Sequence, residues 1–203
     1  MSHMDKIKQY YDENNIAGSP DYYILGWESE EAQKLRFEQL IGNLGLEGRT
    51  ILDVGCGTGN LLEYIGTKFT NFRYTGIDVL PHMIERAEQK KLNGNFICMD
   101  LFKNNPYSNK SFDIIFSSGI FNLNLGNNVD FLLDAVEMFQ SLAGEAVSFN
   151  LLWDKSQDKD NKYFYFSPED VLDKLNSKYE GIWDITIQKG YLHNDFTVYL
   201  KKK

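Results

Sequence analysis

Three glycines at alternating positions are the residues whose type and spacing most clearly suggest chemistry. They lie within residues 51–59, which read ILDVGCGTG, at the point where an apolar run gives way to a helical pattern. Glycine permits backbone angles that other residues avoid, and it lets a ligand approach the main chain closely. The free N–H groups at the start of the following helix add a partial positive charge. The spacing therefore predicts a ligand-binding loop at the carboxyl end of a strand.

Two acids close the next two apolar runs of the chain. Asp78 lies 19 residues beyond the last glycine of the loop, where an acid can accept both hydroxyls of a ribose; capping the helix before Pro81 is the alternative. Asp100 could accept from an adenine amino group while Leu101 and Phe102 pack on the ring, or it could be a turn residue. With Asp53 in the glycine loop segment, acids lie at three successive strand ends. This arrangement favours a common ligand over three unrelated turns.

Short apolar runs alternate with helical patterns from residue 50 onward. Strands are expected near 50–54, 72–77, 95–99, 112–116 and 145–150, and helices near 59–68, 81–91, 128–142 and 168–178. Apolar strands separated by helices indicate a parallel sheet that is covered on both faces. The segments 182–188 and 195–201 have no helix between them, so they should pair antiparallel as a hairpin. The sequence predicts an α/β sheet of about seven strands whose last strand is reversed, with an irregular crossover at 100–111.

The segment before residue 48 has a different character. Residues 1–4 read as an expression remnant, and residues 5–47 are expected to form a helical, aromatic cap. Within that cap, Ser29 and the acids after it signal a helix start and Gly42 its end. Residues 48–203 are expected to carry the ligand site, in a protein that forms a single domain overall.

Composition excludes several classes of protein. The 203 residues are 42% hydrophobic and 25% charged, the balance of a globular protein. The net charge of −8 leaves no broad basic surface for duplex nucleic acid. No apolar run approaches the roughly 20 residues that span a bilayer, and no signal peptide opens the chain. Cys56 and Cys98 are too few for a disulfide framework, so a cytoplasmic protein without a membrane partner is expected.

Residues 53–59, Asp-Val-Gly-Cys-Gly-Thr-Gly, resemble the first motif of the class I S-adenosylmethionine-dependent methyltransferases, and the resemblance covers about residues 48–200. It implies a Rossmann-like, doubly wound fold and the cofactor S-adenosyl-L-methionine, with S-adenosyl-L-homocysteine as product. Asp53 would hold the cofactor's amino group, Asp78 its ribose and Asp100 its adenine. Residues 112–119 resemble the fourth-strand motif, whose end faces the sulfonium and the substrate. The cofactor residues expected on this basis are Asp53, Gly55, Cys56, Gly57, Gly59, Asp78, Val79, Met83, Asp100, Leu101, Phe102, Ser117 and Gly119.

The resemblance implies in-line displacement of a methyl group to an oxygen, nitrogen or carbon atom. The short chain favours a small-molecule acceptor, then a peptide or protein, and no pair of acids is arranged to bind a metal. A catalytically silent cofactor-binding regulatory protein stays open as an alternative. An NAD-dependent oxidoreductase is less favoured, because Asn60 stands where the dinucleotide fingerprint has glycine or alanine and Asp53 would face a pyrophosphate. The sequence leaves the oligomeric state open.

Few residues are candidates for the acceptor side. His193, between the last two expected strands, has an ordinary pKa of about 6.5 that suits a general base, or it is an exposed loop residue. Asn122 could orient an acceptor or form a turn. Arg36 could pair with the methionine carboxylate or form a surface salt bridge. The residues expected to contact substrate, some of them in an aromatic lid, are Tyr11, Tyr22, Trp27, Asn124 and Trp153.

Overall fold

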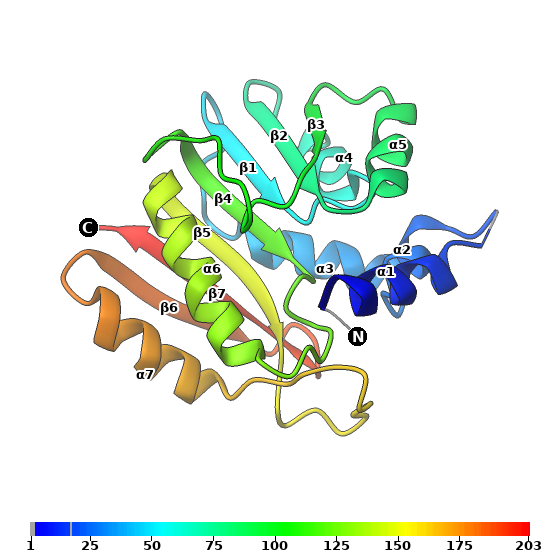
Figure 1. Ribbon diagram of the computed structural model, residues 1–203. Helices are drawn as coiled ribbons and strands as arrows, with labels where there is room; N and C mark the ends of the chain where they lie inside the picture. Colours follow the sequence, from blue (N-terminus) through cyan, green and yellow to red (C-terminus); the bar gives the residue numbers. More distant parts are fainter. Residues whose placement is uncertain (1–2, 17) are drawn as a thin grey trace.

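A seven-stranded sheet of order β3-β2-β1-β4-β5-β7-β6 forms the centre of the molecule (Figure 1). The computed structural model describes residues 3–16 and 18–203. The strands are β1 Thr50–Val54, β2 Arg73–Asp78, β3 Asn95–Cys98, β4 Phe112–Ser118, β5 Ala143–Leu152, β6 Trp183–Lys189 and β7 Asp195–Lys202. Strands β1 to β5 run parallel, and β7 lies between β5 and β6, antiparallel to both. The predicted α/β fold with a reversed strand is confirmed.

The helices follow the predicted pattern from residue 29 onward. They are α1 His3–Asn14, α2 Asp21–Ile24, α3 Glu30–Ile41, α4 Asn60–Gly66, α5 Pro81–Gln89, α6 Asn128–Leu142 and α7 Pro168–Tyr179. The bounds of α1 and α2 were not predicted; no residue of α1 is fully buried, and its apolar side chains Met4, Ile7 and Tyr11 are only partly buried. No helix in the described part of the chain is long and apolar enough to cross a membrane.

The N-terminal part of the chain lies beside the ends of the central strands. Residues 1 and 2 of the expected expression remnant fall outside the described residues, whereas His3 and Met4 belong to α1. Ser29 caps the start of helix α3, and its Oγ accepts from the N–H of Ala32 at 3.0 Å. The division of the chain at residue 48 stays a prediction.

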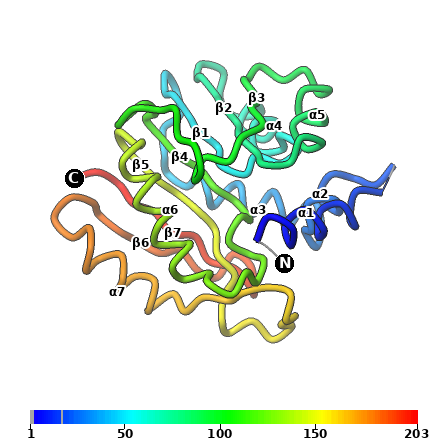
Figure 2. The backbone as a smooth tube through the Cα atoms, viewed as in Figure 1, coloured from blue at the N-terminus to red at the C-terminus, as the bar shows by residue number. Residues whose placement is uncertain are grey.

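The chain reverses its direction across the sheet between β1 and β4. It passes from β1 outward to β2 and β3, then crosses back to β4 on the other side of β1 (Figure 2). No helix lies in the crossover between β3 and β4, as predicted. Ligands of open α/β sheets bind at the carboxyl ends of strands beside such a reversal. The topology therefore places a site at the ends of β1 and β4.

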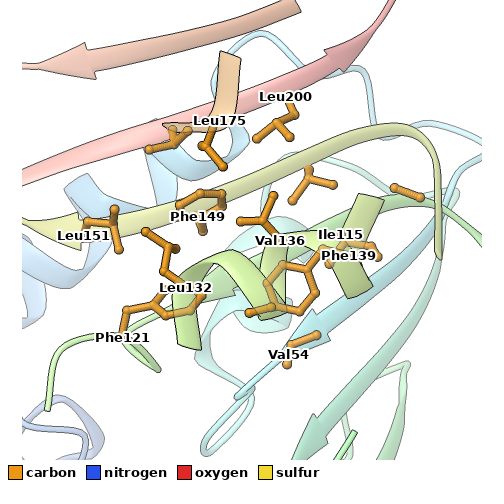
Figure 3. Packing of buried hydrophobic residues seen from close by; sticks show 14 of the residues in the cluster. Val54, Ile115, Phe121, Leu132, Val136, Phe139, Phe149, Leu151, Leu175 and Leu200 are labelled. Atoms are coloured by element: carbon orange, nitrogen blue, oxygen red, sulfur yellow. The ribbon is translucent and has the colours of Figure 1, made fainter. Parts of the chain in front are cut away.

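Apolar side chains hold helices against both faces of the sheet. Helices α6 and α7 pack on one face through a large buried cluster, shown in Figure 3, and α3 and α4 pack on the other. The cluster in Figure 3 includes Leu132, Val136 and Phe139 of α6, Phe149 of β5, Leu175 of α7 and Leu200 of β7. Each such side chain contributes roughly 1.5–3 kcal/mol when it is fully buried. The sheet is therefore a firm support for the loops at its edge.

Candidate active site

A cavity of about 310 Å³ lies at the carboxyl ends of the central strands. We call it the first cavity. The cap contributes the side chains of Tyr11, Leu25, Trp27 and Gln33 to its wall. Most of the predicted cofactor residues line it as well: Asp53, Gly55, Cys56, Gly57, Asp78, Val79, Met83, Asp100, Leu101, Phe102 and Gly119. The structure therefore brings together, around one space, residues from five separate segments of the chain.

Gly59 and Ser117 do not line the first cavity. Gly59 precedes α4 with φ of +79°, and a Cβ there would lie 3.0 Å from Cζ of Phe96 and 3.3 Å from Cβ of Ala87. Its small size thus lets α4 pack closely on its neighbours. Ser117 is fully buried, and its Oγ donates to the carbonyl of Val54 at 2.9 Å. Both residues support the glycine loop from outside the cavity.

The glycine loop has a backbone that only glycine accommodates without strain. Gly55 and Gly57 have φ of +78° and +53°. A Cβ at Gly57 would lie 2.6 Å from Cδ2 of Leu25, and one at Gly55 would collide with the side chain of Ile120. The N–H of Gly55 donates to the carbonyl of Ile77 at 2.8 Å, which joins the loop to β2. Without Cβ atoms on the loop, Leu25 and Ile120 pack directly against its backbone in the wall of the first cavity.

Asp78 joins the glycine loop to the start of α5. Its Oδ2 accepts from the N–H of Gly57 and its Oδ1 from the N–H of Leu80, both at 2.9 Å. Burial raises the pKa of Asp78, and the two backbone N–H groups oppose that shift. Each carboxylate oxygen can accept a further hydrogen bond, and Asp78 lines the first cavity. The side chain combines the capping role with a position suited to a diol.

Asp53 is buried beneath the loop, with 2% of its surface exposed. Burial raises the pKa of Asp53 from 3.8 to about 7, and the charge of Asp78 adds to this shift. The hydroxyl of Tyr74 donates to Oδ2 of Asp53 at 2.5 Å and opposes the shift. The carboxyl group is therefore close to half-ionised at neutral pH. A cation placed beside it would favour the ionised form.

Cofactor affinity should rise with pH because of Asp53. S-adenosylmethionine carries a net positive charge, so it binds better to the ionised carboxylate, and protonation below a pKa of about 7 opposes binding. From about pH 5.5 to about pH 7 the affinity should increase by about tenfold or more, as the linkage relation requires. Calorimetric titration in buffers of different ionisation enthalpy checks both the affinity and the proton release. Asp53→Asn should remove most of the pH dependence of cofactor affinity and leave the part due to Asp78. If affinity rises as steeply with pH in this variant as in the original protein, Asp53 is not the group responsible.

Asp100 and the residues after it form the far wall of the first cavity. Oδ1 of Asp100 accepts from the N–H of Phe102 at 3.2 Å, and Nζ of Lys103 lies 3.1 Å from Oδ2. Asp100 thus forms a turn and also lines the cavity. The ring of Phe102 packs against Phe131 with centroids 5.2 Å apart, and Leu101 is 2% exposed. An apolar wall beside one carboxylate suits a purine ring with an amino group.

A second cavity of about 250 Å³ adjoins the first. The two cavities share the lining residues Tyr11, Leu25, Trp27, Gly119 and Leu123. The second cavity is lined further by Tyr10, Glu28, Arg36, Asn122, Leu152, Asp158, Tyr163, Tyr165 and Asn194. Because Gly119 directly follows β4, the junction between the cavities lies at the end of that strand. Molecules held in the two cavities would meet there.

The cap forms a wall of both cavities. A Cβ at Gly119 would lie 3.1 Å from Cη2 of Trp27, so the indole reaches the junction. The hydroxyl groups of Tyr10 and Tyr163 are 2.8 Å apart and join α1 to the loop before α7. Tyr11 and Trp27 therefore lie where a substrate or lid role requires. Tyr22 lines neither cavity, and its carbonyl accepts from the N–H of Trp27 at 2.8 Å.

The other predicted acceptor residues are not all at the site. Asn122 lines the second cavity, whereas Asn124, Trp153 and His193 line neither. Oδ1 of Asn124 accepts from the N–H of Gly126 at 3.2 Å, so it forms a turn at the surface. The Trp153 ring lies beneath Nζ of two lysines, and His193 is exposed in the turn between β6 and β7.

A buried ion pair joins α3 to β7. Nη2 of Arg36 pairs with Oδ2 of Asp195, and the two side chains are 3% and 2% exposed. Arg36 thus forms a salt bridge, but a buried one, and it lines the second cavity. Burial raises the pKa of Asp195, and Arg36 opposes that shift. The sequence held one signal for this ion pair: Asp195 begins a strand that is covered on both faces, and a buried acid needs a partner.

Other lining residues were missed because no local pattern marks them. They come from the cap, from the end of β4 and from the loop before α7, and they include Leu25, Gln33, Ser118, Ile120, Tyr163 and Tyr165. Among the described residues Gln33 Nε2 is buried without a hydrogen-bond partner, while its Oε1 accepts from Asn60 at 3.0 Å. An unpaired donor of this kind in the wall of the first cavity suits a ligand carboxylate.

Comparison with known proteins agrees with this geometry. Residues 51–140 match a family described as a methyltransferase domain. Rv1506c of Mycobacterium tuberculosis, provisionally named a methyltransferase, is 29% identical over 166 residues, which are 75% of this chain and 93% of that protein. A malonyl-[acyl-carrier protein] O-methyltransferase of Acetivibrio thermocellus is 32% identical over 114 residues, 53% of this chain and 40% of the relative. The chain therefore spans less than half the length of that relative.

The solved structure of the DhpI–SAH complex has the same fold. It superposes with a TM-score of 0.70 and 17% identity, covering 98% of this chain and 96% of that one. The first cavity fits S-adenosyl-L-methionine, the cofactor of these proteins, since its wall combines the glycine loop, three carboxylates and the unpaired amide of Gln33. Residues 51–140 match a methyltransferase domain, and the motif at residues 53–59, the strand order and the cavity agree with those of S-adenosylmethionine-dependent methyltransferases.

Proposed function

We propose that this protein transfers a methyl group from S-adenosylmethionine to an oxygen, nitrogen or carbon atom of a small molecule held in the second cavity. The observation that carries the proposal is the junction of the two cavities at Trp27 and Gly119. When bound, the cofactor supplies a methyl group on a sulfonium that needs no further activation. The chain's task is then alignment, which contributes roughly 7–11 kcal/mol in favourable intramolecular cases.

Buried polar contacts hold the end of β4 in place. Oγ of Ser118 donates to Oδ1 of Asn150 at 2.8 Å, and Nδ2 of Asn150 donates to Oγ1 of Thr197 at 2.8 Å. These bonds connect β4 to β5 and β7 directly behind the junction. A fixed strand end allows Gly119 and Asn122 to position an acceptor without a large loss of order on binding.

The tyrosines of the second cavity act as hydrogen-bond donors and apolar walls. Burial raises the pKa of Tyr11 and of Tyr163, so both hydroxyls stay protonated at neutral pH. His193 is exposed outside the cavity, so of the two predicted catalytic residues only Asn122 lines it. Aromatic ring faces also attract cations by roughly 0.5–2 kcal/mol, and Tyr11 and Trp27 line the cavity where the sulfonium would lie.

The proposal is tested first by titration and then by turnover. We expect the purified protein to bind S-adenosylmethionine and S-adenosylhomocysteine and not NAD. Formation of S-adenosylhomocysteine is then followed over a panel of small hydroxyl, amine, carboxyl and activated-carbon compounds, with a peptide mixture as a second panel. Cofactor binding without turnover on any panel would favour the silent regulatory protein, and binding of NAD alone would favour the oxidoreductase.

Replacing Asn122 with alanine should lower turnover and leave cofactor binding intact. Loss of one hydrogen bond to the acceptor costs about 0.5–1.5 kcal/mol, so kcat/KM should fall by up to about tenfold. Asn124→Ala is the matched control, because Asn124 is exposed two residues away and lines neither cavity. Steady-state kinetics of both variants checks the prediction, and equal losses in the two would contradict a role for Asn122.

A cytoplasmic location and the absence of a duplex nucleic-acid partner stay predictions from composition. A small-molecule acceptor is supported by the size of the second cavity, about 250 Å³. The Acetivibrio relative is named for O-methylation of a malonyl group on a carrier protein, so a carrier-bound acceptor is the second possibility for this chain.

A further inference from the structure

The guanidinium of Arg36 is the most unusual group in the second cavity. It is 3% exposed, and only Nη2 has a partner, the carboxylate of Asp195. Nε and Nη1 are buried without hydrogen-bond partners among the described residues. Buried donors are nearly always paired in folded proteins, so two unpaired donors on one charged group point to a missing acceptor.

The position of Arg36 is fixed independently of any ligand. The Trp27 ring lies 4.7 Å from Cζ of Arg36 and covers one face of the guanidinium. Asp195, the first residue of β7, pairs with Nη2. A group held by stacking and by an ion pair has little freedom left to lose on binding, so its remaining donors are preorganised.

Arg36 belongs to the second cavity and not to the first. Gln33, one turn earlier in α3, lines the first cavity and has its own unpaired donor, Nε2. Arg36 lines only the second cavity. The carboxylate of the cofactor therefore has a donor without Arg36, and the guanidinium remains for the acceptor.

Resting on the function proposed above, we propose that the second cavity takes acceptors that carry a carboxylate, and that Arg36 binds it. The guanidinium has five N–H donors in a planar arrangement, so it can hold Asp195 and a ligand carboxylate at once. Tyr163 and Tyr165 supply apolar ring surface for the rest of an acceptor. Arg36 is thus a specificity-determining residue, and the carboxylate is an anchor.

The charges around the cavity are compatible with an acid. Glu28 and Asp158 also line it, but both are exposed, so water and salt screen their repulsion. Nζ of Lys162 lies 5.0 Å from the centroid of Tyr163, and Nζ of Lys159 lies 5.6 Å from that of Tyr165. Asp195 is buried beside Arg36, so its repulsion and the attraction of Arg36 both act where the effective dielectric constant is lower.

The test compares acids with their uncharged amides. Protein saturated with S-adenosylhomocysteine is titrated with benzoate and benzamide, phenylacetate and phenylacetamide, and indole-3-acetate and indole-3-acetamide, followed by ligand-observed NMR. At least one acid should bind about tenfold or more tightly than its amide, in line with a charge-assisted hydrogen bond. If no acid binds better than its amide, the inference is wrong.

Arg36→Lys keeps the positive charge beside Asp195 and removes the planar donor group. The preference for the acid should disappear in this variant, while affinity for S-adenosylhomocysteine stays within about twofold of the original protein. Arg49→Lys is the matched control, since Arg49 pairs with Glu145 at 2.8 Å at the surface, outside both cavities, and it should keep the preference. A tenfold loss of S-adenosylhomocysteine affinity in Arg36→Lys would overturn the inference by assigning Arg36 to the cofactor.

Failure of the proposed function gives a different result. If acids bind in an Arg36-dependent way but are never methylated, the carboxylate site is supported and the proposed methyl transfer is wrong. If acceptors without a carboxylate are methylated at equal rates by the original protein and by Arg36→Lys, the methyl transfer is supported and the carboxylate site is wrong.

Discussion

Replacing Asp78 with alanine is expected to weaken S-adenosylmethionine binding by about 2–4 kcal/mol, a factor of roughly thirty to a thousand, if two charge-assisted hydrogen bonds to the ribose are lost. The structure adds a second cause to the same result. The N–H groups of Gly57 and Leu80 lose their acceptor, so the glycine loop and the start of α5 are no longer joined. Calorimetric titration of the variant with the cofactor measures the effect.

A matched acid separates the ligand's contribution from that of the fold. Oδ2 of Asp113 accepts from the N–H and from Oγ1 of Thr50, both at 2.7 Å. These two residues lie at the amino ends of β4 and β1, away from the first cavity. Asp113→Ala therefore removes two hydrogen bonds without touching the first cavity, and its cofactor affinity should be unchanged. A folded Asp78→Ala protein with full affinity would exclude Asp78 from the ribose site.

Replacing Asp195 with alanine should destabilise the fold by about 3–5 kcal/mol, because it leaves the guanidinium of Arg36 buried and unpaired. For a chain of this size the melting temperature should fall by roughly 6–20 °C, at about 2–4 °C per kcal/mol. Thermal unfolding followed by circular dichroism measures the change. A melting temperature within about 2 °C of the original would mean that water reaches Arg36 in the variant.

The double variant Arg36→Met with Asp195→Asn is the control for this second prediction. It removes both charges, so no ion remains buried without a partner, and the stability should recover most of the loss. Burial raises the pKa of Asp195, which shows that desolvation outweighs the attraction of Arg36 for this carboxyl group. The pair is therefore expensive to break but not strongly stabilising when intact.

The sheet could be predicted from sequence because its signals are local. Each strand from β1 to β5 is a short apolar run, and the alternating pattern of residues 182–201 without a helix requires a hairpin. Helix α3 has a cap at Ser29 and acids in its first turn. The bounds of helix α1 escaped prediction because its apolar stripe, Met4, Ile7 and Tyr11, is short and only partly buried. The cap packs over the site through contacts with distant parts of the chain, and a strong periodic pattern in the sequence does not mark such contacts.

The same distinction holds for the site. The positions of Asp53, Asp78 and Asp100 follow from strand ends, since parallel strands bring their carboxyl ends to one edge. Side chains on the loops beyond those ends are a different case. Asn122 and Asn124 are two residues apart, yet only Asn122 lines a cavity. His193 follows a strand end at the same sheet but is exposed, because a turn's direction depends on contacts elsewhere in the chain.

The interior place of β7 determines the order in which this protein can fold. In the chain β7 follows every other strand, but in the sheet it lies between β5 and β6 and also carries the carboxylate that pairs with α3. A ribosome therefore delivers β5, α7 and β6 before the strand that joins them exists. Until β7 is made, the outer edge of β5 and the whole of β6 have no strand partner. Strands β6 and β7 can join the sheet only after β7 has been made, and until then the open edges of β5 and β6 are the surfaces most exposed to wrong pairing.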